Sequence, residues 1–592
     1  MLTAPFVLLD DARDGGAGAR LYTDPVEIVR ADRVAEVAPA LERLRGARAR
    51  GLHAAGYLTY EAGAALMARP LPVGDSDGPL LWFGLFAAAR VLDGEAVAAL
   101  LPDPAGAWAA APRPRVTRER YDAALAEVLA MIRAGDVYQA NLTLRADVAI
   151  AGDPCALYAR LRRRAAAGYG ALVATGDRHL LSLSPELFFA LDGDALVCRP
   201  MKGTATRGDT AEEDAARIAT LHGDAKQRAE NLMIVDLMRN DMSRVAVPGS
   251  VAVPALFTVE SYPTVHQMTS TVTARLAAGR DAVDVLEALF PCGSITGAPK
   301  QRSMEVIAAV EDAPRGIYTG AIGRIDADGD AAFNVAIRTL AVPAGAEVAE
   351  LGLGSGIVAD SRADDEWAEV QAKGAFVTAG QRPLDLIETM AFDPEEGVVL
   401  LERHLRRLTA SAAALGFRFD RHGARNELQA ATFRLRHAAR IRLLLAQSGG
   451  IAIEIAPAPA SHAGPLRVAV VPLPVATGDF RLRHKTSDRG FYDAARRAAG
   501  TDEVVFVRPD GLLTEGSFTS LFVPGVEGRL VTPPLSLGLL PGVLRAEMID
   551  SDRASEGYLS PDDLSAPFFV GNALRGLMPA VVAIAKEPLL SL

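Results

Sequence analysis

The stretch "RPMKGTATRG", residues 199–208, places a lysine, Lys202, directly after "ALVCRP" (195–200), a segment with the apolar pattern of a buried strand. A Lys-Gly pair in a short run of Gly and Thr is most often a solvated turn. Lys202 would have a chemical role only if other polar residues of the chain gathered around it. The rest of the sequence therefore decides between a turn lysine and a reactive one.

The composition is that of a folded chain with room for more than one core. The chain has 592 residues, of which 50% are hydrophobic and 23% charged, and its net charge is −11. This length predicts several domains or two large ones. An acidic chain lacks the clustered basic surface that phosphate binding requires, so we expect no nucleic-acid partner. The arginine run at 162–164 is expected on a solvated helix face.

Cysteine usage and hydropathy favour a cytoplasmic protein. The three cysteines, Cys155, Cys198 and Cys292, have no CxxC spacing and predict no disulfide framework. No apolar run reaches the ~18–20 residues of a membrane span. The first fourteen residues also lack a basic region followed by a long apolar core. We expect no membrane association and no processing.

Hydrophobic periodicity predicts helices at 117–134, 226–243, 363–375 and 402–415, with strand-like runs such as 331–342 between them. Gly135 and Gly416 are placed to end the first and last of these helices. Gly and Pro interrupt the chain at 379–384, after the third helix. We therefore divide the chain into one domain at 1–378 and a second at 379–592.

Polar residues recur before this break in an order that a plain core would not require. The segments are "DVYQANLT" (136–143), "SPELF" (184–188), "RPMKGTATRG" (199–208), "AENLMIVDLMRND" (229–241), "PCGSITGAPKQRSME" (291–305), "GIYTGAIG" and "FNVAIRTL" (316–340), and "GLGSGIVADSRADDEWAEVQAK" (352–373). Each is weak alone. Together they resemble the chorismate-utilising enzymes over residues 1–378. The resemblance implies an α+β sandwich of antiparallel sheets flanked by helices, which binds chorismate with magnesium.

The resemblance implies a metal site and a carboxylate site. Glu230 and Glu369 would be the magnesium ligands, because this cation prefers carboxylate oxygens and waters. Glu366, one helical turn from Glu369, would support them, although solvated helix glutamates are the alternative. The implied substrate-binding residues are Tyr318, Arg338, Gly354, Gly356, His266 and Thr296.

Among these, Arg338 and Tyr318 would hold the enolpyruvyl carboxylate of chorismate, since a guanidinium fork suits that group. Backbone N–H groups around Gly354 and Gly356 would complete the cradle. Ser355 stands where the family usually has Gly or Ala, a departure that leaves the backbone role open.

The resemblance also gives Lys202 a role. Glu186 of "SPELF" matches the general acid that protonates the departing C4 hydroxyl. Anthranilate synthases look like "PIAGT" where this chain has "PMKGT", whereas aminodeoxychorismate synthases look like "PIKGT". A desolvated lysine can lose its proton and act as a nucleophile. Asn231 points the same way, because anthranilate synthases tend to have His there.

Nothing in the chain resembles a glutaminase, which would show a Cys nucleophile in a Gly-rich elbow with a downstream His and Glu. We therefore expect ammonia to come from solution or from a separate glutamine amidotransferase subunit. Regulation by an amino acid bound to residues 1–115 is not decided by the sequence.

A second ordered set of motifs follows the break. It consists of "ERHLRRLTASAAALGF", "RHKTSDRGFYDAAR", "DEVVFVRPDGLLTEGSFTSLFV" and "LLPGVLR". The set resembles the fold-type IV pyridoxal-phosphate enzymes, which include D-amino-acid and branched-chain aminotransferases and aminodeoxychorismate lyases. The resemblance implies a fold-type IV domain at 379–592 that binds pyridoxal 5'-phosphate.

By this resemblance, Lys485 would hold the cofactor covalently and Glu515 would pair with its pyridinium nitrogen. Arg407 would contact the phosphate, together with backbone N–H groups of Gly542 and Val543 at a helix start. Asn572 of "GNALRG" is a further cofactor-binding candidate. The chain departs from the family with "PGVLR" in place of "GITR" and with Ser520 in place of Asn.

The two resemblances together imply a bifunctional enzyme of folate-precursor synthesis. The first domain would aminate chorismate to 4-amino-4-deoxychorismate, and the second would release pyruvate from it to give 4-aminobenzoate. An anthranilate synthase remains the alternative for the first domain. The second could instead be an amino-acid aminotransferase or a non-catalytic dimerisation module. A homodimer through the second domain stays open.

Overall fold

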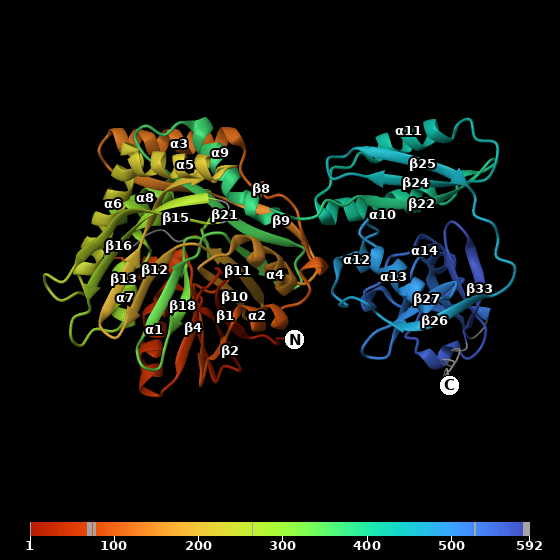
Figure 1. The fold of residues 1–592 in the computed structure, drawn as a ribbon, viewed down its shortest axis with the longest axis horizontal. Helices are drawn as coiled ribbons and strands as arrows, with labels where there is room; N and C mark the ends of the chain where they lie inside the picture. Colours follow the sequence, from red (N-terminus) through yellow and green to blue (C-terminus); the bar gives the residue numbers. More distant parts are fainter. Residues whose placement is uncertain (1, 68–73, 75–77, 263–264, 526–527, 584–592) are drawn as a thin grey trace. The chain divides into compact units, whose positions relative to one another are not determined.

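The computed structural model describes residues 2–67, 74, 78–262, 265–525 and 528–583. The chain divides into two compact units (Figure 1). The first contains residues 1–101, 111–148 and 158–380, and the second contains 102–110, 149–157 and 381–592. Two short segments from the first third of the chain therefore belong to the second unit.

The first unit has two large, mainly antiparallel sheets among its described residues. In spatial order, the strands of one sheet are β17 (Gly297–Ala298), β9 (Gln139–Ala151), β21 (Val348–Ile357), β20 (Thr339–Pro343), β11 (Arg178–Ser184), β10 (Tyr169–Ala174), β1 (Phe6–Asp11), β2 (Gly18–Thr23) and β6 (Arg90–Leu92), with β8 (Arg113–Pro114) beside β9. The other sheet is formed by β14 (Met201–Thr206), β16 (Val265–Arg275), β13 (Ala195–Arg199), β12 (Leu187–Asp192), β19 (Ala331–Val335), β18 (Ala321–Ile325), β4 (His53–Leu58), β5 (Leu81–Phe86) and β3 (Glu27–Ala31), with β15 (Ala252–Ser261) beside β16.

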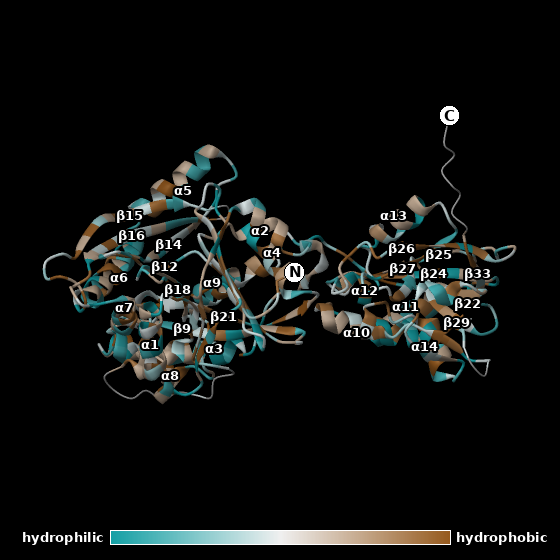
Figure 2. Ribbon diagram, turned by 90° about the horizontal axis from the view of Figure 1, so that it is seen from below, coloured by the Kyte–Doolittle hydropathy of each residue, from teal (hydrophilic) through white to brown (hydrophobic). Residues whose placement is uncertain are grey.

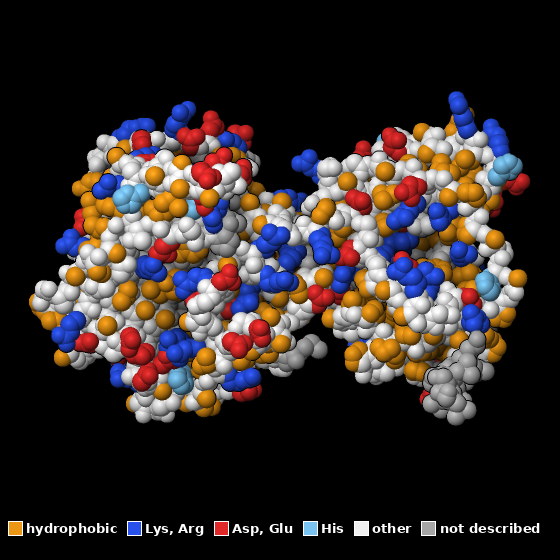
Figure 3. Space-filling model, in the orientation of Figure 1, with side chains coloured by type: hydrophobic (Ala, Val, Ile, Leu, Met, Phe, Trp, Pro, Cys, Tyr) orange, Lys and Arg blue, Asp and Glu red, His pale blue; other side chains and the backbone are white. Residues whose placement is uncertain are grey.

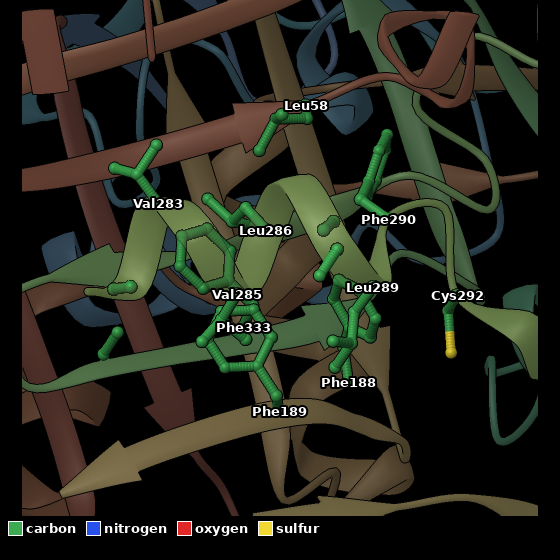
Figure 4. Close-up of a cluster of buried hydrophobic side chains, with 14 of the residues drawn as sticks. Leu58, Phe188, Phe189, Val283, Val285, Leu286, Leu289, Phe290, Cys292 and Phe333 are labelled. Atoms are coloured by element: carbon green, nitrogen blue, oxygen red, sulfur yellow. The ribbon is translucent and has the colours of Figure 1, made fainter. Parts of the chain in front are cut away.

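Two apolar cores hold these sheets in place. One contains residues of both sheets, such as Val7 and Val173 from the first and Tyr57 and Trp82 from the second. The other lies between the second sheet and its helices, where residues of α7 pack against Phe188, Phe189 and Phe333 (Figure 4). The helices of this part of the chain are α1 (Val34–Ala49), α2 (Gly94–Leu100), α3 (Arg118–Arg133), α4 (Pro154–Ala165), α5 (Ala211–Gly223), α6 (Ala225–Ser243), α7 (Ala282–Leu289), α8 (Lys300–Val310) and α9 (Ala363–Gly374).

The second unit has a small antiparallel sheet and a larger mixed one. The small sheet orders β23 (Gly397–Val398), β22 (Leu386–Asp393), β24 (Ala439–Leu445) and β25 (Ile451–Pro457). The larger orders β28 (Leu513–Gly516), β27 (Glu503–Val507), β26 (Leu466–Pro472), β33 (Gly576–Val582), β32 (Phe568–Asn572), β29 (Ser520–Pro524), β30 (Leu530–Thr532) and β31 (Ala554–Glu556). The helices are α10 (Leu401–Leu415), α11 (Arg421–Thr432), α12 (Phe480–Arg483), α13 (Gly490–Ala499) and α14 (Val543–Asp550).

Trp108 belongs to the core of the second unit although it precedes most of the first unit in the sequence. It lies in β7 (Trp108–Ala109), which pairs with the last residues of β9. Its ring lies 6.0 Å from that of Phe417 and 6.1 Å from that of Phe480, and its indole N–H donates to the carbonyl of Leu415 at 2.9 Å. The core of this unit is therefore built from distant parts of the sequence.

Most of the predicted elements are present, with two differences. The predicted strand at 331–342 is two strands, β19 and β20, because the backbone turns at Arg338, whose φ is +50°. The arginine run at 162–164 is only partly solvated, since Arg162 forms an ion pair with the buried Asp10.

In the described residues, no helix is both long and apolar enough to cross a membrane. Figure 2 shows helices such as α5 carrying hydrophilic and hydrophobic residues together.

Candidate active sites

Lys202 lies in a strand and not in the turn that the sequence suggests. It follows Pro200 in β14, and the pairing of β14 with β16 shifts register between Met201 and Thr204. Gly203 has a φ of +100°, a conformation that glycine adopts at little cost. The Lys202 side chain is 17% exposed. The bulge thus belongs to a site that holds the lysine largely out of water.

The surroundings of Lys202 favour its neutral amine. Its Nζ lies 3.9 Å from Oε2 of Glu230, on α6. Burial lowers the pKa of Lys202 below its ordinary value, and the negative charge of Glu230 opposes this shift only in part. A lysine with a lowered pKa has a larger neutral, nucleophilic fraction near neutral pH.

Gly356 on β21 makes room for this amine. A Cβ on Gly356 would lie 2.5 Å from Nζ of Lys202 and 2.9 Å from Nε2 of Gln139. Both distances are shorter than real contacts of a Cβ, so no larger residue fits without moving the lysine. The structure therefore gives Gly356 a steric role, whereas the sequence suggests a backbone cradle for it.

Glu186 has the environment of a carboxyl whose pKa lies near neutral pH. Its residue is 4% exposed, and its Oε1 accepts a hydrogen bond from the Ser294 hydroxyl at 2.7 Å. Burial raises the pKa of Glu186 to about 7, although Ser294 and Lys202 lower it. A general acid is most effective when its pKa lies near the working pH. The interaction with Lys202 also shows that the two groups lie close together.

The proposed metal ligands, Glu230 and Glu369, come from different helices, α6 and α9, and interact electrostatically. Burial raises the pKa of Glu230, and the charge of Glu369 contributes to the rise. Glu369 is half exposed, and its Oε1 lies 2.6 Å from Nζ of Lys373. Glu366 is buried; its Oε1 accepts from the Ser361 hydroxyl at 2.7 Å, while its Oε2 has no partner among the residues that the structure describes.

This donor set fits magnesium, which is held by one or two carboxylates together with substrate oxygens and waters. It does not form a closed protein cage. No three His, Cys, Asp or Glu side chains gather as a metal site in the part of the chain that the structure describes.

Tyr318 lies just before β18 and Arg338 just before β20, and the Thr319 N–H donates to the Ala336 carbonyl at 2.9 Å. Burial lowers the pKa of Arg338, and no described residue accepts a hydrogen bond from its guanidinium. Tyr318 is 7% exposed and lies beneath the guanidinium of Arg145, whose Cζ is 5.5 Å from the ring centre. The carbonyl of Gly354 accepts a hydrogen bond from Nζ of Lys373 at 2.9 Å. Arg338 thus remains available to an anion.

His266 and Thr296 use their polar atoms within the protein. The ring of His266 is fully buried, with Nδ1 2.9 Å from the Ser261 hydroxyl and Nε2 2.7 Å from Oδ1 of Asp214. The Thr296 hydroxyl donates to the carbonyls of Cys292 and Gly293, each at 3.2 Å. Both side chains therefore have partners within the protein, and their role in substrate binding stays a prediction.

Three further residues lie around Lys202. Asn231 enters the sequence analysis only through the comparison with anthranilate synthases, and Gln139 and Ser294 are not among the predicted site residues. Gln139 at the start of β9 is fully buried, and neither atom of its amide has a partner among the described residues. Ser294 contacts Glu186, as described above. Asn231 donates to the Lys202 carbonyl at 3.5 Å and accepts from the Ser270 hydroxyl at 2.6 Å. Only the uninterrupted motifs "DVYQANLT" and "PCGSITGAPK" could have indicated Gln139 and Ser294 from the sequence.

The second unit holds a separate lysine site in a cavity of about 390 Å³. Lys485 follows α12, and its carbonyl accepts a hydrogen bond from the Ile387 N–H at 2.8 Å, which fixes its backbone to β22. Burial lowers the pKa of Lys485 to about 7, and the charge of Arg407 contributes to the shift. The amine is therefore substantially neutral at physiological pH.

Glu515 of β28 lines the same cavity. Its Oε1 accepts a hydrogen bond from the Tyr492 hydroxyl at 2.7 Å, and its Oε2 accepts from the Leu540 N–H at 3.2 Å. Burial raises the pKa of Glu515 to about 7, while Arg489 and Tyr492 lower it. The two hydrogen bonds hold the carboxylate in one orientation, which suits pairing with a fixed heterocyclic nitrogen.

Arg407 lines the cavity and is held in place by the carboxylate of Glu388. Its Nε and Nη2 donate to the two oxygens of Glu388, at 2.9 and 2.6 Å, and Nδ1 of His404 lies 2.6 Å from Glu388. Burial alone would raise the pKa of Glu388, but Arg407 and His404 lower it to about 2. Arg407 is therefore held rigidly by a charged partner.

Gly542, Val543 and Asn572 complete the lining. Gly542 is the N-cap of α14, and a Cβ on it would lie 2.5 Å from the hydroxyl of Ser520. The missing side chain of Gly542 therefore makes room for the Ser520 hydroxyl at a helix start, where backbone N–H groups favour an anion. The amide oxygen of Asn572 accepts from the Leu574 and Arg575 N–H groups at 3.0 Å each, and its Nδ2 donates to the Phe518 carbonyl at 3.2 Å. These features fit pyridoxal 5'-phosphate.

The fold and the sites define an α+β chain with two separate lysine sites, one beside carboxylates and one in a cation-lined cavity. The chorismate binding enzyme family matches residues 5–379, more than half of the chain, and the chain belongs to this family. The amino-transferase class IV family matches residues 385–582, and this domain implies pyridoxal phosphate.

Curated relatives include both possible types of first unit. Aminodeoxychorismate synthase component 1 of Salmonella typhimurium is 44% identical over 43% of this chain and 56% of its own length. Anthranilate synthase component 1 of Haloferax volcanii is 39% identical over 47% of this chain and 53% of its own length. The chain thus spans little more than half the length of these relatives. The crystal structure of anthranilate synthase component I from Streptococcus pneumoniae TIGR4 matches with 25% identity and a TM-score of 0.52, covering 64% of this chain and 93% of that one.

Proposed function

We propose that the first unit aminates chorismate to 4-amino-4-deoxychorismate and that the second unit converts this product to 4-aminobenzoate and pyruvate. The observation that carries the proposal is the pair formed by Lys202, an amine with a lowered pKa, and Glu186, a carboxyl with a raised one. A nucleophile and an acid are what replacement of a ring hydroxyl requires.

The first reaction takes place in two steps. The neutral amine of Lys202 forms a bond to C2 of the ring while the C4 hydroxyl leaves as water with the proton of Glu186. Ammonia then forms a bond to C4, the bond from Lys202 to C2 breaks, and Glu186 recovers a proton from the new amine. Lys202 and Asn231 favour this reaction over anthranilate formation. Ammonia comes from a separate glutamine amidotransferase subunit or from solution.

Two anion sites orient the substrate. Glu230 and Glu369 would hold a magnesium ion, which supplies positive charge for the ring carboxylate. Arg338, whose guanidinium has no acceptor among the described residues, would bind the enolpyruvyl carboxylate, with Tyr318 beside it. Gly356 keeps the space above Lys202 free for the ring.

In the second unit, Lys485 would take the proton from C4 of the aminated ring while the bond from C3 to the enolpyruvyl oxygen breaks. The released enolpyruvate takes up a proton and becomes pyruvate, and the ring becomes aromatic. Pyridoxal phosphate supplies an electron sink for this proton removal. Glu515, held by Tyr492, would pair with the pyridine nitrogen, and Arg407 and the start of α14 would hold the phosphate.

The test is chorismate with magnesium and ammonium, followed by chromatography of the products. Wild-type protein should form 4-aminobenzoate. Lys202→Ala should lose amination but still convert supplied aminodeoxychorismate, and with no ammonia wild type should show a chorismate-derived mass on the peptide that contains Lys202. Lys202→Arg keeps the charge and is the matched control for an electrostatic role. Full amination by Lys202→Ala, or anthranilate as the product, would overturn the proposal for the first unit.

A further inference from the structure

The cavity of the second unit is strongly cationic. Its lining includes Arg407, Arg440, Lys485, Arg489, Arg496 and Arg575. Glu515 is the one carboxylate among the described lining residues. Figure 3 shows Lys and Arg side chains gathered around a hollow in this unit. The cavity therefore favours anionic occupants.

Several of these cations have no carboxylate partner in the protein. Arg407 is neutralised by Glu388, and Arg496 donates to Asp493 at 3.2 Å. For Arg440, Arg489 and Arg575, the described part of the chain offers no carboxylate within ion-pair distance. Nη1 of Arg489 is, in addition, enclosed by protein and has no hydrogen-bond partner in the described residues. An enclosed guanidinium nitrogen without an acceptor is costly, and a bound anion would satisfy it.

Arg489 does not belong to the phosphate cradle at Arg407 and Gly542. It is the N-cap of α13, and its Cζ lies 4.3 Å from the centre of the Tyr492 ring, whose hydroxyl donates to Glu515. Its charge also lowers the pKa of Glu515. Arg489 therefore lies near Glu515, where the ring nitrogen of the cofactor is expected, and one phosphate does not account for all of the unpaired cations.

We propose that Arg440, Arg489 and Arg575 form a second anion site, which selects amines that carry two carboxylates. The inference rests on the proposed function of the second unit and deepens it, because it names the residues that set substrate class. Bidentate guanidinium pairs suit carboxylates. A cyclic dicarboxylated amine, such as the product of the first unit, and an acyclic dicarboxylic amino acid share this chemistry. An aliphatic monocarboxylic amino acid does not.

The test uses the full-length protein loaded with cofactor and follows the visible cofactor spectrum during titration. The probes lack an amine, so they bind without reacting: 3-(carboxymethoxy)benzoate has two carboxylates, and 3-methoxybenzoate has one. Wild-type protein should bind the dicarboxylate more tightly. Arg489→Gln and Arg440→Gln should each weaken this binding about tenfold or more, the range expected when a charge-assisted hydrogen bond is lost. The monocarboxylate should be affected less.

Matched controls are Arg497→Gln, on the exposed side of α13, and Arg436→Gln; the wild-type Arg436 guanidinium donates to the backbone carbonyls of Phe433 and Leu435. Both should bind the dicarboxylate as wild type does. Titration with glutamate and with aminodeoxychorismate then shows whether the site prefers an acyclic or a cyclic dicarboxylated amine. Equal affinity of wild type for the two probes would overturn the inference, as would loss of the cofactor itself from Arg489→Gln.

The proposed function can fail separately. A protein without a cofactor band would refute the lyase step, and calorimetric titration of the same variants with 3-(carboxymethoxy)benzoate would then decide on the anion site. The first unit contributes equally to wild type and variants in that measurement, so a difference between them belongs to the second unit. No difference would refute the site.

Discussion

Replacing Ser294 with alanine should change how amination depends on pH. The Ser294 hydroxyl donates to Oε1 of Glu186 at 2.7 Å and lowers the pKa of that carboxyl, which burial raises to about 7. A hydrogen bond to a charged group contributes about 1.5–3 kcal/mol. One pKa unit corresponds to about 1.4 kcal/mol. Loss of the hydroxyl should therefore raise the pKa of Glu186 by about one to two units.

The direction in which the pH profile should shift follows from the role of Glu186. An acid works in its protonated form, so wild-type amination should fall as the pH rises through about 7. In Ser294→Ala this alkaline limb should move to higher pH, while the rate on the plateau falls because the carboxyl is no longer held in one orientation. The assay is chorismate consumption in a single turnover, measured across pH at a constant concentration of free ammonia.

Two controls separate this effect from general damage to the fold. Ser294→Thr keeps a hydroxyl and should retain the wild-type limb. Ser243→Ala removes a hydroxyl that bonds only to the carbonyl of Asn240 at the end of α6 and should change neither limb nor plateau. A lower plateau in Ser294→Ala with an unmoved alkaline limb would refute the argument, because a structural role alone gives that result.

Three further changes test the other elements of the sites. Glu369→Gln should sharply raise the magnesium concentration needed for amination, since one of two carboxylate ligands is lost; an unchanged magnesium titration would reject Glu369 as a ligand. Lys485→Ala should lack the borohydride-reducible visible absorption of bound cofactor, and persistence of that absorption would show that another residue holds it. Gly356→Ala should slow amination without unfolding the protein, because its Cβ would lie 2.5 Å from Nζ of Lys202; wild-type rates with a normal thermal melting curve would exclude the steric role.

The sequence predicts which types of residue form the two sites better than it predicts their local structure and burial. The motif around Lys202 indicates a reactive lysine, but the local Gly and Thr suggest a turn where the structure has a bulged strand. The reason is that β14 is stabilised by its partner β16, which is distant in sequence. Gln139 shows the same limit, because its burial beside Lys202 depends on β9 and β21 lying together. His266 differs from Gln139: the motif predicts a substrate-binding role for it, whereas the structure shows its ring bonded to Asp214 of α5.

The position of Trp108 has a consequence for how the two activities can be separated. A break in the gene at codon 378, where composition indicates the boundary, would give the downstream product Phe417 and Phe480 but not the indole that fills the space between them. Loss of a buried tryptophan costs about 3–5 kcal/mol, much of the stability of an ordinary domain. Independent evolution of the two halves would therefore first require the downstream half to replace that ring. The interleaved core thus makes the fusion difficult to reverse.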